Sequence, residues 1–375
     1  MKVLSIIHAT QPGGVQRVGA VETTMLNKFG YETLLVSILK THEWGIFKEL
    51  GIKPIYLFNS EAFGRLISGL FFKININTKP DIIIAHNNPC AQVAFKLKRK
   101  LEKESKNTPV IFYLHDSLVY PIAGSLFGEI LRIFPQIFKK LEYKHLKESE
   151  IVLVNSEVSL NRVMRNHCLK NLSEKISILY PTTNMPIPKD RVVRDKEEYI
   201  LIVGRMDHEA SYNIYKIMKI LDYPLIVAGY GHPYNPKFKK VLKLFKILMK
   251  KGKDIKIIFS PSDTQLIELY RTASLFIYPG HENFNMSAIE AMSAGCPILV
   301  ADTSGVCEIL PQKLREELCM NKNNIKLWVE RIQEIIRSDK SYELGKKCWK
   351  VTHRYNLNTH IDKLIRILRE VILDV

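Results

Sequence analysis

The chain has 375 residues and a mass of 43.3 kDa, with 46% hydrophobic and 25% charged residues. This composition is that of a globular protein and excludes disorder, collagen-like structure and coiled coil, while the length predicts about two to three domains. The chain has 55 Lys and Arg and 38 Asp and Glu, which gives it a formal charge of +17. That charge can attract nucleic acid, an anionic lipid surface or a phosphorylated small molecule, and it does not choose among them.

The six cysteines show no C-x-x-C pair and no spacing typical of a metal site, so we expect free thiols in a reducing compartment. They are Cys90, Cys168, Cys296, Cys307, Cys319 and Cys348. The apolar run after Met1 is too short for a signal peptide, and no run of about 18 apolar residues is free of charge. We therefore expect a cytoplasmic protein, or one that lies peripherally on the inner face of a membrane.

Short apolar runs rich in β-branched residues alternate with longer helical stretches, which is the rhythm of parallel α/β sheets. In the first half we expect strands at Lys2–His8, Thr33–Leu39, Lys53–Leu57, Asp81–Ala85, Val110–Leu114 and Ile151–Asn155. In the second half we expect them at Tyr199–Val203, Pro224–Ala228, Ile255–Ser260, Leu275–Tyr278 and Pro297–Ala301.

A stretch rich in proline and charge, from residue 181 to 198, has the composition of a domain linker. We expect an N-terminal Rossmann-like domain over 1–183 and a C-terminal one over 198–355. The last stretch, 356–375, has apolar residues at helical spacing, and we expect this amphipathic helix to pack back on the N-terminal domain.

Ligands of such sheets bind beyond the carboxyl ends of the strands, so the residues there are the candidates for function. Gln11–Arg17 follows the first strand with two glycines and is either a phosphate-binding turn or an ordinary tight turn. Arg205 ends a strand and is either a phosphate ligand or a surface arginine. His115 ends another strand and is either catalytic or a hydrogen-bonded loop residue.

The most informative segment is Pro279–Pro297, in which a strand leads into a polar loop and we expect a helix over Phe284–Ala294. Glu282 lies in the loop and Glu290 in the helix. Both carboxylates can line one pocket and accept hydrogen bonds from ribose and hexose hydroxyls, while amides near Asn283–Met286 bind a diphosphate. The alternative is two solvated glutamates beside an ordinary helix start.

From Glu282 onward the sequence reads Glu, seven residues, then Glu290-Ala-Met and Gly-Cys-Pro. This pattern resembles the signature of the retaining glycosyltransferases of family four, also described as glycosyl transferases group 1. Further segments resemble other motifs of that family in the same order along the chain: Gly13-Gly14 with Arg17, His115-Asp116, Tyr180–Asn184, Val203–Arg205 and Ala228–Gly231.

The resemblance implies a GT-B fold, in which two Rossmann-like doubly wound parallel-sheet domains face a central cleft. It implies a metal-independent hexosyltransferase that needs no cofactor besides its nucleoside diphosphate sugar donor. The chain has no Asp-x-Asp motif, which agrees. The acceptor would be a hydroxyl of a glycan, a lipid-linked or a protein-linked group, bound mainly by the N-terminal domain.

The family's roles fall on particular residues of this sequence. The resemblance implies that Arg205 binds the diphosphate, that Glu282 holds sugar hydroxyls, and that His115 lies against the transferred sugar; these three are the catalytic candidates. Glu290 would bind the ribose. The remaining donor-binding candidates are Gly13, Gly14, Asn283, Phe284, Asn285 and Met286.

The sequence departs from the family at two places. A lysine normally follows the arginine by five residues, but Ala210 stands there, so either His208 or Lys216 replaces this charge or activity is weak or absent. Losing one contact to developing charge costs on the order of 3 kcal/mol, or about a hundredfold in rate. Asparagines at 283 and 285 replace common glycines, and asparagine tolerates positive φ.

The basic charge leaves other functions open. Ser117–Lys147 mixes apolar and basic residues as a membrane-surface helix does, as would a helix with a solvated basic face, and Gly64–Lys73 is a second such patch. A nucleic-acid-binding protein is a weaker alternative because the basic residues are spread over both halves and no recognition motif occurs. A nucleotide-sugar-binding partner protein without activity and a nucleotide-sugar epimerase are further alternatives.

Overall fold

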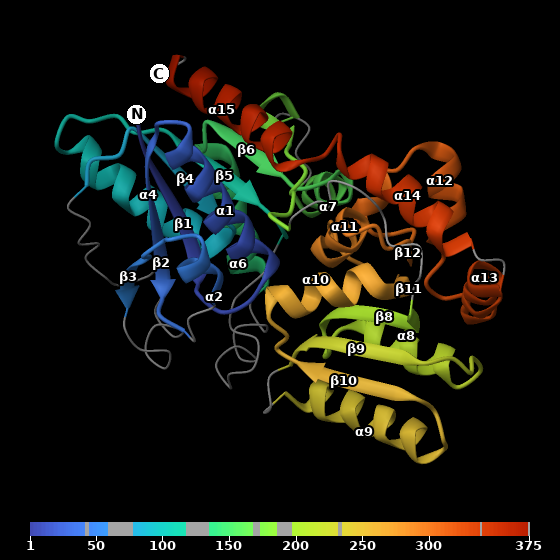
Figure 1. The fold of residues 1–375 in the computed structure, drawn as a ribbon. Helices are drawn as coiled ribbons and strands as arrows, with labels where there is room; N and C mark the ends of the chain where they lie inside the picture. Colours follow the sequence, from blue (N-terminus) through green and yellow to red (C-terminus); the bar gives the residue numbers. More distant parts are fainter. Residues whose placement is uncertain are drawn as a thin grey trace. The chain divides into compact units, whose positions relative to one another are not determined.

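The computed structural model describes residues 1–41, 45–58, 78–117, 135–167, 173–185, 197–231, 235–337 and 340–373. The chain divides into two compact units (Figure 1). Unit 1 comprises Met1–Pro181 together with Asn358–Val375, and unit 2 comprises Thr182–Leu357. Most of the stretch expected as a linker, residues 186–196, lies outside the described residues.

Unit 1 is built around a sheet of seven parallel strands in the order β3-β2-β1-β4-β5-β6-β7. The strands are β1 (Lys2–Ala9), β2 (Glu32–Leu39), β3 (Ile55–Phe58), β4 (Ile82–His86), β5 (Val110–Leu114), β6 (Ile151–Val154) and β7 (Ile176–Ile178). The helices are α1 (Gly14–Lys28), α2 (Gly45–Glu49), α4 (Asn88–Glu102), α6 (Pro135–Glu148), α7 (Glu157–His167), the short 3-10 helix η1 (Ser173–Lys175) and α15 (Leu357–Leu373).

The central strands of unit 1 are buried on both faces, as the nearly continuous apolar runs predict for a parallel sheet covered by helices. Every residue of β4 and β5 is buried. Ile6, Ile83 and Phe112 are fully inaccessible and belong to one apolar cluster, to which the inner face of α4 contributes. The sheet therefore holds the residues at its carboxyl edge on a rigid support.

Helix α15 belongs to unit 1 although it is the last helix of the chain (Figure 1). Its apolar face is buried, including Ile361, Leu364 and Leu368. His360 contacts Glu22 of α1, and the Lys363 ammonium donates to the carbonyl of Ile178. The C-terminal helix is thus part of the first unit's structure.

Unit 2 is built around a sheet of six parallel strands in the order β10-β9-β8-β11-β12-β13. The strands are β8 (Glu197–Arg205), β9 (Leu225–Tyr230), β10 (Ile255–Phe259), β11 (Ala273–Tyr278), β12 (Ile298–Ala301) and β13 (Cys319–Met320). The helices are α8 (Glu209–Met218), α9 (Pro236–Lys250), α10 (Asp263–Thr272), α11 (Met286–Ser293), the short 3-10 helix η2 (Gly305–Ile309), α12 (Gln312–Leu318), α13 (Ile325–Arg337) and α14 (Lys340–Thr352).

The two doubly wound parallel sheets expected from the sequence are confirmed. Every expected strand is present, with ends shifted by at most two residues. The edge strands β7 and β13 were not predicted, because three and two residues give no periodicity to recognise. The helix expected from Phe284 begins instead at Met286, because Asn285 caps it with φ 79° and accepts a hydrogen bond from the amide of Ala288.

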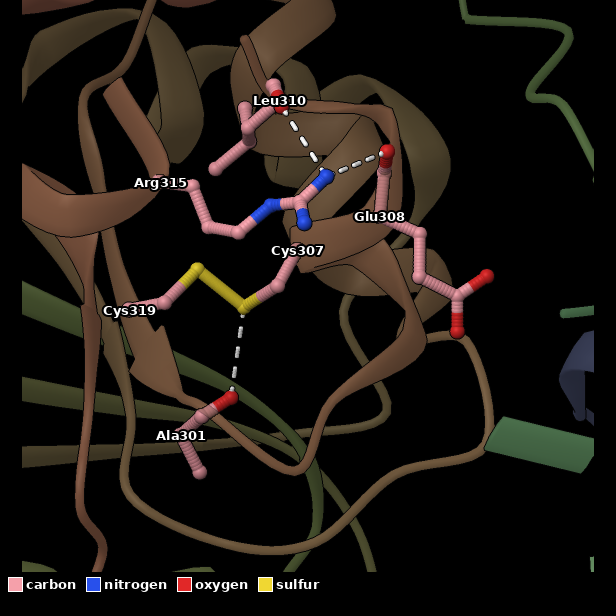
Figure 2. The surroundings of a disulfide bond; sticks show 6 residues. All are labelled: Ala301, Cys307, Glu308, Leu310, Arg315 and Cys319. Carbon is pink, nitrogen blue, oxygen red and sulfur yellow. Dashed lines mark hydrogen bonds between the residues drawn. A yellow bond between two sulfur atoms is a disulfide. The ribbon is translucent and has the colours of Figure 1, made fainter. Parts of the chain in front are cut away.

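The cysteine prediction is wrong for two residues, because Cys307 and Cys319 form a disulfide (Figure 2). It joins η2 to β13, and the Arg315 side chain supports the same turn by donating to the carbonyls of Glu308 and Leu310. Twelve residues of sequence separation with no motif gave no signal of this pairing. Cys90, Cys296 and Cys348 are buried and are not in a disulfide, and the cysteine pattern no longer favours a reducing compartment.

Among the described residues, no helix combines the length and apolar character needed to cross a membrane.

Two glycines let β8 and β9 approach closely just before Arg205. Gly204 and Gly229 lie opposite each other in the parallel register, with φ of 155° and 149°. A Cβ atom at Gly229 would lie 1.9 Å from the Gly204 carbonyl oxygen. Only glycine fits there, since both the backbone conformation and the space exclude a side chain.

Gly229→Ala is expected to lower the free energy of unfolding by about 3 kcal/mol, because backbone strain and a backbone clash add. Gly252→Ala is the matched control, since Gly252 also has a positive φ, 85°, but nothing lies within 4 Å of the added Cβ. This variant has backbone strain without a clash, so its free energy of unfolding should fall by about 1 kcal/mol. Urea denaturation measures both. Equal losses would show that the contact between the strands is not tight.

Candidate functional site

The order of the strands places the ends of β8 and β11 side by side in unit 2. The chain winds outward from β8 through β9 to β10, then returns to β11 on the other side of β8. Ligands of open parallel sheets bind at such a reversal, beyond the carboxyl ends of the strands. Arg205 ends β8 and Tyr278 ends β11, so their side chains and the following loops form the candidate site of this unit.

Arg205 is held in one orientation by Asp207. Its Nε and Nη2 atoms donate to the two Asp207 carboxylate oxygens at 3.2 and 3.1 Å. Asp207 is fixed in turn by Asn235, whose Nδ2 donates to it at 2.6 Å. The Arg205 side chain remains 67% exposed. It can therefore add a charge-assisted contact to an incoming anion without rearranging.

The electrostatic environment keeps Arg205 a cation and couples it to Glu282. Partial desolvation lowers the pKa of Arg205, but the bonds to Asp207 and the charges of Asp207 and Glu282 outweigh this effect and raise it above the ordinary value. Arg205 and Glu282 therefore lie in one electrostatic neighbourhood.

Glu282 is oriented by Tyr278, a residue that the sequence analysis assigned only to a strand. The Tyr278 hydroxyl donates to Glu282 Oε1 at 2.6 Å. Burial raises the pKa of Tyr278 well above its usual value, and the charge of Glu282 adds to this effect, so the phenol stays a donor. The backbone of Glu282 is fixed as well, because its carbonyl accepts from the amide of Gly305 at 3.1 Å. Tyr278 is the missed site residue, since a tyrosine closing a buried strand resembles core.

His208 lies against the same pair. Its Nδ1 is 3.2 Å from the Tyr278 hydroxyl, and its Nε2 is 3.9 Å from Glu282 Oε1. Because the hydroxyl donates to Glu282, it accepts from His208 Nδ1–H. Lys216 instead donates to Asn213 Oδ1 at 3.3 Å within α8. Of the two residues considered as substitutes for the absent lysine, only His208 contacts this cluster.

The position of the absent lysine is closely packed. Ala210 is 1% exposed, and a Cβ atom at Gly280 would lie 2.9 Å from both the Cβ and the amide nitrogen of Ala210. The start of α8 therefore presses against the loop that carries Glu282. Neighbouring Glu209 secures this contact, since it accepts from Lys322 at 2.8 Å and from the amide of His281 at 3.4 Å.

Glu290 is buried at 5% exposure within α11, where the Tyr270 hydroxyl donates to its Oε2 at 3.1 Å. The amide of Ala288 donates its hydrogen bond to the Asn285 side chain. The amides of Met286 and Ser287 precede it in the first turn of α11, where helical amides have no partner within the helix. Asn283 and Phe284 form the loop just before this turn, with Phe284 buried at 2% exposure.

Unit 1 carries the other predicted residues at the carboxyl edge of its own sheet. Gly13 and Gly14 start α1 directly after β1, with Gly13 in an extended conformation, and Arg17 is buried one turn later. His115 follows β5 and is 5% exposed. Its neighbour Asp116 is bonded to Arg162 Nη1 at 2.7 Å.

His115 is held from several directions. Its amide donates to Asn87 Oδ1 at 2.8 Å, its carbonyl accepts from Asn155 Nδ2 at 3.1 Å, and its ring stacks on Tyr113 with centroids 4.1 Å apart. The ring nitrogen Nε2 lies 3.0 Å from Nδ1 of His86. Burial, followed by the neighbouring His86, lowers the pKa of His115 well below its usual value, so the imidazole is neutral at pH 7.

Other predictions fall partly or wholly outside the described residues. Of the basic stretch 117–147, residues 118–134 are outside, and the patch at 64–73 is entirely outside. Helix α6 is described and exposes Lys139, Lys140, Lys144 and Lys147. Within the parts of the chain that are described, no three His, Cys, Asp or Glu side chains are grouped as metal ligands would be.

Residues 186–348 match the family model described as glycosyl transferases group 1. The chain is 22% identical over 293 residues to lipopolysaccharide 1,2-N-acetylglucosaminetransferase from Salmonella typhimurium, covering 73% of this chain and 71% of that protein. It is 32% identical over 128 residues to an uncharacterized glycosyltransferase from Methanocaldococcus jannaschii, a match that spans about a third of each protein.

A solved structure of Alr3699/HepE from Anabaena in complex with UDP-glucose superposes with a TM-score of 0.74. The match covers 99% of this chain and 100% of that chain at 13% identity. At this identity the likeness shows the fold alone, and that fold is GT-B.

Tyr278→Phe is expected to weaken binding of a nucleotide sugar about tenfold, because Glu282 loses the donor that orients it. Tyr199→Phe is the matched control: the Tyr199 hydroxyl is bonded to Leu269 and Thr272 in the same unit but away from Glu282. Both variants should lose similar stability. Calorimetric titration with UDP-glucose and GDP-mannose measures the affinity of each variant. Equal affinities of the two variants would show that Tyr278 is not part of the site.

The free energy of unfolding should fall as the pH falls below 6.5, because the unfolded chain then protonates histidines that the folded chain keeps neutral. His115 has a lowered pKa in the folded state, so its contribution is complete above the unfolded pKa and is lost on acidification. His115→Gln should reduce the slope of the free energy of unfolding against pH by up to about 1.4 kcal/mol per pH unit. Denaturation at pH 7, 6 and 5 measures it, and an unchanged slope contradicts the neutral assignment.

Proposed function

This chain is a member of the glycosyl transferases group 1 with a GT-B fold, and we propose that it transfers a hexose from a nucleoside diphosphate sugar to a hydroxyl acceptor. We propose further that transfer retains the anomeric configuration and needs no bound metal. The observation that carries this proposal is that Arg205 and Glu282 interact at the strand reversal of unit 2, with α11 beginning at Met286, shortly after Glu282.

The diphosphate is the group that this edge of unit 2 suits best. Arg205 is a fixed, exposed cation, and the first turn of α11 offers backbone amides and the positive end of a helix dipole. As the bond to the sugar breaks, negative charge develops on the leaving diphosphate. A fixed guanidinium and fixed amides stabilise that charge in the way a divalent ion does elsewhere.

The two signature glutamates suit different parts of the donor. Glu290 is buried and bonded to Tyr270, so its carboxylate is restrained within α11 to bind a ribose hydroxyl. Glu282 stands on a loop, held by Tyr278 beside His208, and its second oxygen can accept from hexose hydroxyls. Retention is proposed because the signature Glu282 to Glu290 resembles that of retaining enzymes.

Unit 1 supplies the residues proposed for the sugar and the acceptor. His115 is neutral, rigidly held and placed at the carboxyl edge of its sheet, and Gly14 exposes the first amide of α1. The acceptor is proposed to be a glycan or a lipid-linked group. The exposed lysines of α6 support attachment to an anionic membrane as part of this proposal.

One observation favours a second candidate function, a partner protein that binds nucleotide sugar without turning it over. Ala210 is buried against Gly280 where the family has a lysine. His208 is the residue that can supply a second positive charge beside Glu282. Binding without turnover would support the second candidate.

A panel of UDP, GDP and ADP sugars, tested in EDTA, decides between the candidates. The enzyme should be stabilised against heat by one nucleotide class and should hydrolyse or transfer its sugar, with EDTA having no effect. Arg205→Gln should lower turnover by about a hundredfold or more, through the loss of charge stabilisation. Arg366→Gln, which removes one charge from the exposed face of α15, should leave it unchanged.

Three results would each contradict one part of this proposal. Turnover abolished by EDTA and restored by a divalent ion would contradict metal independence. Full turnover by Arg205→Gln would contradict the site. Stabilisation by nucleic acid alone, with none by any nucleotide sugar, would favour the alternative of a nucleic-acid-binding protein.

A further inference from the structure

The outer face of helix α9 in unit 2 is basic over its whole length. The helix contains six lysines and no Asp or Glu. Its inner face is apolar and packs against α8 and β10 (Figure 1), with Val241, Phe245 and Leu248 at most 2% exposed. The apolar face that a membrane-surface helix would insert is therefore already used for folding, and the lysine side is the one that faces solvent.

Four of these lysines form one row along the solvent face, which we call the lysine row. They follow one another at intervals of four, three and four residues, the spacing of neighbours on one side of a helix. All four side chains are exposed. The row consists of Lys239, Lys243, Lys246 and Lys250. Like charges at this spacing repel one another, so the lysine row works against the stability of α9.

The lysine row has no countercharge among the described residues, since no carboxylate there forms an ion pair with any of its members. Other charged residues of unit 2 are paired. Lys253, just past the end of α9, lies 3.1 Å from Asp222, and Lys340 of α14 lies 2.6 Å from Glu334. The lysine row is therefore suited to an anionic partner outside the chain.

An apolar side chain stands within the lysine row. Ile247 is 36% exposed, four residues after Lys243 and three before Lys250, so it lies on the same face of the helix. Phosphate contacts of a nucleic acid give an exposed isoleucine no partner, and α9 contains no Arg, Asn or Gln to contact bases. The surface of an anionic bilayer offers both charged head groups and an apolar layer below them.

We propose that the lysine row of α9, with Ile247 inside it, is a docking surface for an anionic lipid bilayer. The ammonium groups contact the lipid head groups, and Ile247 enters the layer just below them. This surface lies on unit 2, whereas the attachment considered under the proposed function uses α6 of unit 1. Docking itself does not rest on the proposed function; only its use, to bring the enzyme to a lipid-linked acceptor, does.

Flotation of the full chain with lipid vesicles measures the docking. The chain should bind vesicles of phosphatidylcholine and phosphatidylglycerol but not vesicles of phosphatidylcholine alone, and added salt should weaken binding. A triple variant with Lys239→Gln, Lys243→Gln and Lys250→Gln should bind about a hundredfold more weakly, because each lysine near an anionic surface contributes about a fivefold factor. These changes relieve repulsion within α9, so the variant should be at least as stable as the parent.

The matched control is a triple variant of α14 with Lys346→Gln, Lys347→Gln and Lys350→Gln. These lysines are also exposed in unit 2, and the variant loses the same net charge. Its binding should stay within about threefold of the parent, because screening by salt limits the effect of charges away from the bilayer. Equal weakening in both triple variants would show that net charge alone drives binding, which overturns the inference.

Ile247→Gln separates a bilayer from other anionic partners. It should weaken vesicle binding about fivefold, because the apolar side chain no longer enters the bilayer. Leu327→Gln, at a leucine of α13 that is 42% exposed, should leave binding unchanged. An Ile247→Gln variant that binds vesicles like the parent, or a parent that binds RNA or DNA but no vesicles, overturns the assignment to lipid.

Two further outcomes separate this inference from the proposed function. If a variant of α6 with Lys139→Gln, Lys140→Gln and Lys144→Gln loses vesicle binding while the α9 variant keeps it, the inference fails and the attachment through unit 1 stands. If the α9 variant loses binding as expected but the parent turns over no nucleotide sugar, the proposed function fails and the docking surface stands.

Discussion

The pairing of β8 with β11 is the constraint on which the candidate site depends. These strands are far apart in sequence but adjacent in the sheet, because the chain winds away through β9 and β10 before it returns. Strand β8 ends at Arg205 and strand β11 ends at Tyr278. The strands thereby bring an oriented guanidinium and an oriented carboxylate to one edge of the sheet, as the proposed function requires.

The close fit of the loops has a consequence for charge. Gly280 leaves room for Ala210 at the start of α8, and Lys322 neutralises Glu209 beside it. In the proposed function, the diphosphate therefore depends on the Arg205 guanidinium and the amides of α11, among the residues that the structure describes. His208 is the neighbour that lies nearest to take the place of the second cation, with its Nε2 3.9 Å from Glu282 Oε1.

The sequence predicted the sheets well because both are doubly buried and their strands are nearly continuous apolar runs. It pointed to Arg205 and Glu282 as candidates because each follows the carboxyl end of a predicted strand. It missed the role of Tyr278, since a tyrosine that closes a strand carries no motif, and it missed the disulfide between Cys307 and Cys319. The contact of Glu22 with His360 spans 338 residues, and no periodicity in a single sequence indicates such a pair.

The central claim is that unit 2 binds the pyrophosphate of a nucleotide sugar between Arg205 and the start of α11. A crystal structure with the nucleotide sugar that binds most tightly tests it most directly. We expect pyrophosphate oxygens within hydrogen-bond distance of the Arg205 guanidinium and the Met286 or Ser287 amides, with a ribose hydroxyl on Glu290. A nucleotide bound elsewhere, with Arg205 still paired only to Asp207, would contradict it.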